Sequence, residues 1–223
     1  MDSDEALERL QVMSADQFGM FTVPQAATVG VDRAALEELE EQWELSSWVE
    51  GVYKLPGASN HGEVYERWLS LAPATFARDR VAPGCGVVSH GSAAQRLASS
   101  KFGAGFLAVT FPPETPLPDG LNAAIPDRYV HRAPLPPQDW FMCDGVPVTT
   151  PARTVKDLLD NHYDDCPIED ETTIGRYLLR MERRGVDLAE LAAELDGWAR
   201  RNDRRNGEFL VRSISAATHP PQS

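Results

Sequence analysis

Residues 21–55 read FTVPQAATVGVDRAALEELEEQWELSSWVEGVYKL, and the order of helix start and stop signals in this stretch decides the fold. Thr22 followed by Gln25 has the spacing of a capping box, which marks the start of a helix. Gly30 supplies a turn, and Asp32 can cap a second helix directly after it. Two short helices joined by a glycine turn predict a helix-turn-helix.

A hairpin is predicted after the second of these helices. Residues 48–55 alternate apolar and polar side chains around Gly51, which is typical of two short antiparallel strands. Before the helix-turn-helix, a capping box at Asp2 predicts a first helix that runs toward Phe18. Three helices followed by a hairpin predict a winged helix-turn-helix domain over residues 1–57.

The helix after Asp32 has an apolar and an acidic side. Leu36, Leu39 and Trp43 recur at helical spacing, and we expect them to pack inward. The outward side carries carboxylates, namely Glu37, Glu40, Glu41 and Glu44. Like charges four residues apart cost roughly 0.2–0.5 kcal/mol per pair, and the same side chains would repel DNA phosphates. Two interpretations stay open, a solvated helix face or a docking surface for a basic partner protein.

DNA binding is a further possibility, because the third helix of a winged helix commonly enters the major groove. Few side chains in this domain suit such a contact. They are Thr22, Gln25, Arg33 and Lys54.

The chain is strongly acidic. Its 223 residues include 21 Lys and Arg against 34 Asp and Glu, which gives a formal net charge of −13. Residues 1–58 alone hold twelve acids and three bases. Such a chain repels nucleic acid and anionic membranes as a whole, so a DNA contact has to be local. The sequence has no long apolar run, and Cys85, Cys143 and Cys166 form no CxxC pair, so we expect a cytoplasmic protein without a membrane partner.

Residues 58–212 are predicted to form a second, mixed domain. The turn-rich stretch 55–60 separates it from the first domain, and residues 213–223 are expected to be a flexible tail. Short apolar runs predict strands over residues 86–89, 106–111 and 128–135, and residues 141–149 predict a hairpin around Asp144 and Gly145. Helices are expected between and after them, so the fold class is α+β with a helical C-terminal end.

Arginines are concentrated near the C-terminus. Along a predicted helix they fall at i, i+4, i+7 and i+8, on one face: Arg176, Arg180, Arg183 and Arg184. One interpretation is pairing with the chain's own acids, and the other is a site for phosphate or for a partner molecule. The sequence leaves both open.

Enzymatic and metal sites are the less favoured interpretations. Ser89, His90 and Ser92 are close in sequence, but no GxSxG elbow surrounds them, and a strand end followed by a helix cap explains the serines. His162 and Cys166 have a spacing that could bind zinc, but there is no second pair with ligand spacing. We therefore predict no catalytic residues, no metal and no cofactor.

Several motifs together resemble one known family. Residues 21–31 and 51–57 are similar to the N-terminal winged helix of the AbiEi antitoxins of type IV, abortive-infection toxin–antitoxin systems. The stretches VSHGSAA, VHRAPLPP and GVPVTTPARTVKDLL resemble the domain that follows it; they span residues 88–94, 130–137 and 145–159.

This resemblance implies an antitoxin that neutralises a nucleotidyltransferase toxin and represses its own promoter through the winged helix. It places Tyr53 beside Thr22, Gln25, Arg33 and Lys54 as a DNA contact. Relatives usually carry a basic third helix, whereas here the glutamates 37–44 replace it. The alternative is an acidic winged helix that binds protein and not DNA, with the four glutamates and the four arginines as partner contacts.

Overall fold

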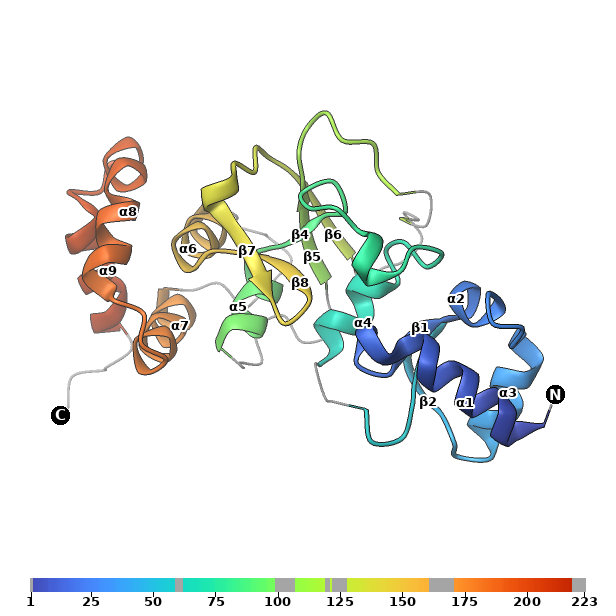
Figure 1. The fold of residues 1–223 in the computed structure, drawn as a ribbon. Coiled ribbons are helices and arrows are strands. Elements are labelled where there is room, and N and C mark those ends of the chain that lie inside the picture. Colours follow the sequence, from blue (N-terminus) through green and yellow to red (C-terminus); the bar gives the residue numbers. More distant parts are fainter. Residues whose placement is uncertain are drawn as a thin grey trace.

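Helices and strands are both present in the computed structural model, which describes residues 2–58, 62–98, 107–118, 121, 128–160 and 171–217. The expected α+β class is confirmed at this level. The N-terminal elements lie at one end of the molecule, a larger sheet lies in the middle, and α7, α8 and α9 lie at the other end (Figure 1). Among the described residues, no helix is long and apolar enough to span a membrane.

The first part of the chain combines short helices with a small sheet. Its elements are α1 (Ser3–Ser14), the 3₁₀ turn η1 (Ala15–Gln17), β1 (Met20–Thr22), α2 (Val23–Ala27), α3 (Arg33–Glu41), β2 (Ser46–Val49) and β3 (Val52–Lys54). The strands form an antiparallel sheet in the order β1-β3-β2. The helices begin where the sequence predicts, because the side chains of Asp2, Thr22 and Asp32 each accept a hydrogen bond from a backbone N–H of the first turn.

Strands β1 and β3 of the small sheet are buried on both faces, whereas β2 is partly exposed. Phe21 and Tyr53 lie opposite each other and pack into a core with Leu10, Leu36 and Leu39. Their chain neighbours point to the other face, where the sheet contacts α4 (Glu63–Leu69) and its side chains join the larger core of the molecule. The first part of the chain is therefore packed directly against the second.

The second part is built around a five-stranded mixed sheet in the order β6-β5-β4-β8-β7. Its elements are η2 (Ala77–Asp79), β4 (Val87–Val88), α5 (His90–Ala98), β5 (Leu107–Phe111), β6 (Arg128–Arg132), η3 (Pro137–Asp139), β7 (Trp140–Cys143), β8 (Val146–Thr149) and α6 (Pro151–Asp160). β4 and β8 are parallel neighbours, and each is followed directly by a helix. The carboxyl ends of these two strands therefore place α5 and α6 side by side.

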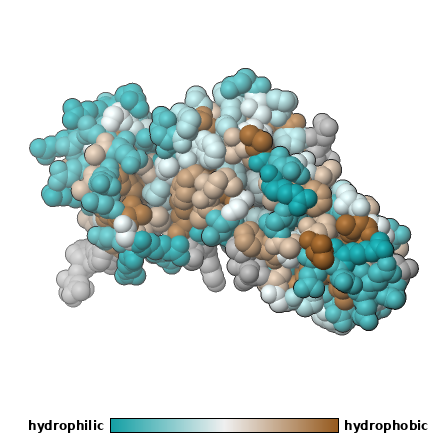
Figure 2. Space-filling view, in the orientation of Figure 1, coloured by the Kyte–Doolittle hydropathy of each residue, from teal (hydrophilic) through white to brown (hydrophobic). Residues whose placement is uncertain are grey.

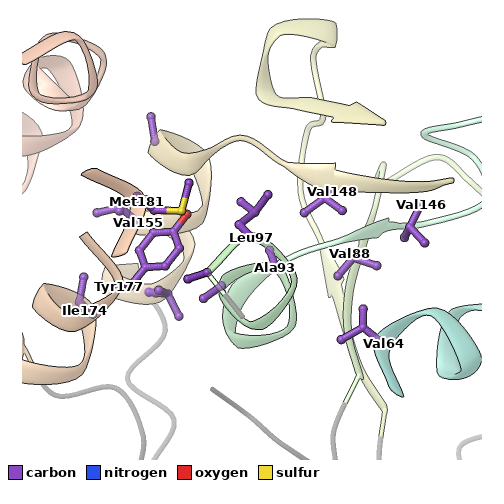
Figure 3. Packing of buried hydrophobic residues seen from close by; sticks show 14 of the residues in the cluster. Val64, Val88, Ala93, Leu97, Val146, Val148, Val155, Ile174, Tyr177 and Met181 are labelled. Atoms are coloured by element: carbon purple, nitrogen blue, oxygen red, sulfur yellow. The ribbon is translucent and has the colours of Figure 1, made fainter. Parts of the chain in front are cut away.

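The larger core joins the sheet to the C-terminal helices through α5. Val88 and Val148 of the sheet lie on one side of α5, and Tyr177 and Met181 lie on its other side with Val155 of α6 (Figure 3). All five side chains are at most 5% exposed. The sheet, α5 and the later helices thus share one continuous core.

The C-terminal helices are α7 (Glu171–Arg183), α8 (Leu188–Arg201) and α9 (Gly207–Ala217). At the start of α9, a Cβ added to Gly207 would lie 1.8 Å from the carbonyl oxygen of Ala192, so only glycine permits this close approach of α9 to α8. The prediction of a flexible tail from Ser213 was wrong for residues 213–217, which are helical. Ile214 is fully buried there, because it follows Leu210 at helical spacing. Residues 218–223 lie outside the described residues.

Candidate interaction surfaces

The outward face of α3 carries a group of exposed carboxylates. Glu37, Glu38 and Glu41 are exposed on the helix, and Glu40 is half-buried. Glu44 is also exposed, but it lies beyond the helix, because α3 ends at Glu41. None of the described C-terminal arginines pairs with these glutamates. The acidic face, defined as Glu37, Glu38, Glu41 and Glu44, is therefore accessible to a partner.

Trp43 differs from the prediction made for it. We expected its ring to pack inward after Leu36 and Leu39, but the side chain is 91% exposed. The reason is the early end of α3: Trp43 has a φ of 63°, so the chain turns away from the helix before the ring could reach the core. Its backbone N–H donates to the carbonyl of Glu40 at 3.0 Å, and the N–H of Glu44 donates to that of Leu39 at 3.0 Å. These two bonds form a Schellman motif.

Thr22 and Gln25, predicted as DNA contacts, are fully buried. The Thr22 hydroxyl donates to the carbonyl of Pro73, and the Gln25 amide donates to the carbonyl of Thr75 at 3.0 Å. Gln25 also accepts a bond from the amide of Gln17 at 3.0 Å. These side chains hold the start of α2 against the segment after α4, so they cannot reach DNA in this conformation, and we do not propose them as DNA contacts.

Gln17 also belongs to the hydrogen-bond network around Gln25, although no feature of the sequence pointed to it. It is fully buried, and its carbonyl oxygen accepts a bond from the backbone N–H of Ala77 at 2.7 Å. Sixty residues separate these two partners in sequence, so no local pattern marks their contact. The paired amides of Gln17 and Gln25 fasten the N-terminal elements to the start of η2.

Tyr53 and Lys54 of β3 point to opposite faces of the small sheet. Tyr53 is only 5% exposed and stacks on Phe21, with ring centroids 6.2 Å apart. Burial raises the pKa of Tyr53, and the nearby carboxylate of Glu40 raises it further. Lys54 shares a face with Met20 and lies near the buried Glu66 of α4; burial raises the pKa of Glu66, and the Lys54 charge acts in the opposite direction.

Arg33 is the one exposed residue of the five predicted DNA contacts, all of which are described. Its guanidinium lies 3.9 Å from the carboxylate of Glu37, one turn along α3. A pair this exposed contributes about 0–1 kcal/mol, so it leaves Arg33 free to move. The surface of α3 nevertheless offers one guanidinium against the four carboxylates of the acidic face.

The predicted arginine stripe on α7 is exposed. Arg176, Arg180 and Arg183 have no acidic partner among the described residues. Arg184 also has an exposed side chain, but it donates to the carbonyl of Leu97 at the end of α5. The arginine face, defined as Arg176, Arg180 and Arg183, is therefore a basic surface at the opposite end of the molecule from α3. Both ends of the molecule are predominantly hydrophilic (Figure 2).

The motifs that follow the N-terminal part meet in a buried polar cluster. Ser89 follows β4, and its Oγ accepts a bond from the hydroxyl of Thr110 on β5 at 2.8 Å. Nδ1 of His90 lies 2.8 Å from the same Oγ, and the His90 ring stacks on that of His131 on β6 with centroids 3.7 Å apart. The sequence placed these residues in separate motifs, and the parallel register of β5 and β6 brings them together.

Arg153 of α6 lies near this cluster, since its charge helps to lower the pKa of His90, and it joins α6 to the segment between β6 and β7. Its guanidinium donates to Asp157 at 2.7 Å, to Asp139 at 2.8 Å and to the carbonyl of Pro134 at 2.9 Å. Burial raises the pKa of Asp157 to about 6, although the Arg153 charge opposes this shift. The guanidinium is thus occupied by two carboxylates and a carbonyl and fixes the path of the chain before β7.

The cluster is poorly suited to catalysis. Burial lowers the pKa of His90 to about 2 and that of His131 to about 4, so both rings are neutral at pH 7 and weakly basic. The hydroxyl of Ser89 is fully buried and cannot reach a substrate. We therefore treat the cluster as a hydrogen-bonded support for the sheet.

No group of three or more His, Cys, Asp or Glu side chains in the described ranges could hold a metal ion. His162 and Cys166, the residues considered as zinc ligands, lie outside those ranges.

Comparison with solved structures finds a crystal structure of similar fold. The crystal structure of the Rv2827c protein from Mycobacterium tuberculosis matches this chain with a TM-score of 0.50 and 18% sequence identity. The match covers 98% of this chain and 83% of that chain. No family model matches the sequence, and no curated protein matches it. At this identity the likeness concerns the fold alone.

Proposed function

We propose that residues 1–57 form a winged helix and that the chain is an antitoxin of the AbiEi type which binds a basic partner protein, and not operator DNA, through the acidic face of α3. The order of helices, capping residues and hairpin supports the winged helix, and the motif resemblance supports the antitoxin class. The choice of a basic protein as the partner follows from the negative charge of the acidic face.

The observation that carries this proposal is the difference between the side chains that are buried around α3 and those that are accessible. Thr22, Gln25 and Tyr53, which would serve a DNA complex, are buried, whereas the carboxylates of the acidic face are exposed. DNA binding depends on neutralising phosphates with cations, and carboxylates in the same place oppose it. The same carboxylates attract a cationic protein and accelerate its association.

The arginine face of α7 would be a second contact region for the same partner. Guanidinium groups match the geometry of carboxylate and phosphate oxygens, so this surface suits an acidic patch on the partner or a nucleotide that the partner carries. A nucleotidyltransferase toxin, the partner class implied by the resemblance, handles such nucleotides.

The test uses the protein encoded next to this chain's gene as the candidate toxin. Its affinity for the full chain is measured by calorimetry for the wild type and for the double variant Glu37→Lys/Glu41→Lys. We expect the variant to bind at least about 10-fold more weakly at low salt, and the difference to shrink as salt is added.

The matched control reverses two exposed glutamates with the same spacing on α8, Glu190→Lys/Glu194→Lys, which changes net charge equally. Equal affinities for the two double variants would show that net charge and not the acidic face of α3 governs binding. Unchanged affinity in both would contradict the proposal.

A further inference from the structure

Two features of Trp43, its backbone conformation and its exposure, are unfavourable for the folded chain. It is the residue after the C-cap of α3, where the left-handed conformation usually selects glycine, and its φ of 63° costs a side chain roughly 1–2 kcal/mol. Its ring is also 91% exposed, so an apolar surface is left in water. A tryptophan in a strained and exposed position does not stabilise the folded state, and such residues are typical of binding surfaces.

A groove lined by both apolar and polar groups lies close to this residue. It has a volume of about 460 Å³ and lies between α1 and the chain after β3; its lining includes Leu7, Gln11, Phe18, Leu55 and Pro56. Glu44, the residue after Trp43, lines it as well. The side chains of Ser3 and Gln42 are hydrogen-bonded at 3.5 Å, which places the loop that carries Trp43 against the start of α1. Trp43 therefore lies beside the groove.

The charges around the groove are negative. Glu44 lines the groove itself, and Glu41 precedes the loop that carries Trp43. The three bases of residues 2–58 lie elsewhere, with Arg9 bonded to Glu5, Arg33 close to Glu37, and Lys54 on the sheet face toward α4. An occupant of this groove therefore meets the apolar side chains of Leu7, Phe18 and Leu55 and the carboxylate of Glu44.

We infer that Trp43 and this groove form a docking site for an arginine-bearing amphipathic segment of a basic protein. The inference rests on the proposed function and names the chemistry of the partner segment. An apolar side chain of that segment enters between Leu7, Phe18 and Leu55, and a neighbouring guanidinium stacks on the Trp43 ring beside the Glu44 carboxylate. Arginine is favoured over lysine, because its planar guanidinium stacks on an aromatic face and bonds a carboxylate at the same time.

The test measures fluorescence anisotropy of labelled peptides with the full chain. One peptide alternates arginine and leucine, a second replaces leucine by serine, and a third replaces arginine by lysine. We expect the arginine–leucine peptide to bind most tightly. The serine-substituted peptide lacks the apolar side chains that contact the groove. The lysine-substituted peptide lacks the planar guanidinium that stacks on Trp43.

Variants then locate the site. Trp43→Gly removes the ring at a position where glycine adopts the backbone without strain, and Gln11→Lys places a cation in the groove on an exposed side chain. Each is expected to weaken the arginine–leucine peptide by about 3- to 30-fold, and Trp43→Gly also removes the preference for arginine over lysine. The control is Trp48→Ala, since Trp48 is 84% exposed but lies on β2 and not in the loop that ends α3 beside Glu44.

The outcomes separate this inference from the proposed function. Weaker binding in Trp43→Gly and Gln11→Lys with wild-type binding in Trp48→Ala supports the docking site. If these three variants bind alike while Glu37→Lys/Glu41→Lys loses affinity, the docking site is wrong and the acidic face stands. If the wild type fails to bind the arginine–leucine peptide, the docking site is overturned, and the acidic face is then judged by the toxin titration alone.

Discussion

The start of α2 and the end of α3 lie in the same N-terminal part of the chain, but polar side chains are buried at the first and an apolar side chain is exposed at the second. At the start of α2, Thr22 and Gln25 are fully buried and hydrogen-bonded to a distant segment. At the end of α3, Trp43 is almost fully exposed in a left-handed backbone. Burying polar groups is favourable only when every group is paired, and exposing a large ring is unfavourable in the isolated chain.

This contrast separates residues that serve the fold from residues that serve a partner. The side chains of Thr22 and Gln25 are engaged in internal hydrogen bonds, so they are not available to DNA. Among the described residues, the Trp43 ring belongs to neither hydrophobic core. Four measurements test this division, beginning with the largest expected effect.

Replacing Gln25 by leucine should destabilise the protein by about 2–4 kcal/mol. The substitution removes the bonds to Gln17, to the backbone N–H of Thr22 and to the carbonyl of Thr75, and leaves the buried N–H of Thr22 unpaired. Urea denaturation measures the change. The control is Gln11→Ala, because Gln11 is exposed, and its effect should stay below about 0.5 kcal/mol. Equal effects at the two glutamines would contradict the claim that the buried hydrogen bonds of Gln25 stabilise the fold.

Acidification should weaken the second buried polar cluster but not the amide network of Gln17 and Gln25, which has no titrating group. The folded pKa values of His90 and His131 lie below 6.5, so the unfolded chain binds more protons and stability falls as pH drops below about 6.5. The raised pKa of Asp157, about 6, acts in the opposite direction. The net loss between pH 7 and 5.5 should be about 1–2 kcal/mol.

The variant His131→Phe keeps a ring for the stack with His90 and removes one titrating group. Its stability should fall less steeply with acid than that of the wild type, as followed by thermal unfolding across the same pH range. An identical slope in both proteins would show that His131 does not contribute.

Replacing Trp43 by glycine should stabilise the protein by about 0.5–1 kcal/mol, because the strain of the left-handed backbone is relieved. Chemical denaturation measures this gain. A loss of stability would mean that the ring makes a contact that matters for the fold, and its role in partner binding would then need another explanation.

The smallest effect is expected for Arg33→Ala, which removes an exposed pair with atoms 3.9 Å apart. Its free energy of unfolding should change by less than about 0.5 kcal/mol. A change above about 1 kcal/mol would show that this surface charge supports the helix, contrary to the division between fold and partner residues.

Local signals in the sequence predicted several helix starts and one turn. The capping residues Asp2, Thr22 and Asp32 located the helix starts, and the Asp144–Gly145 pair located the turn between β7 and β8, where both residues have positive φ. Each of these signals acts within a few residues, so the sequence alone is sufficient to read it.

The candidate site was harder to predict, because its decisive contacts are between distant residues. Thr22 and Gln25 looked like surface residues of α2, and their burial depends on carbonyls about fifty residues later. Trp43 continued the helical spacing of Leu36 and Leu39, but the helix ended two residues before it. The exposure of Glu37 and Glu41 was predictable, since it follows from helical periodicity alone.

The most direct test of the partner class is an electrophoretic mobility shift of DNA from upstream of the gene with the wild-type chain at low salt. The account predicts no retardation at protein concentrations on the order of 10 μM, because α3 presents carboxylates to the phosphates. Retardation that weakens with added salt and is lost in Arg33→Ala would contradict it and restore operator binding.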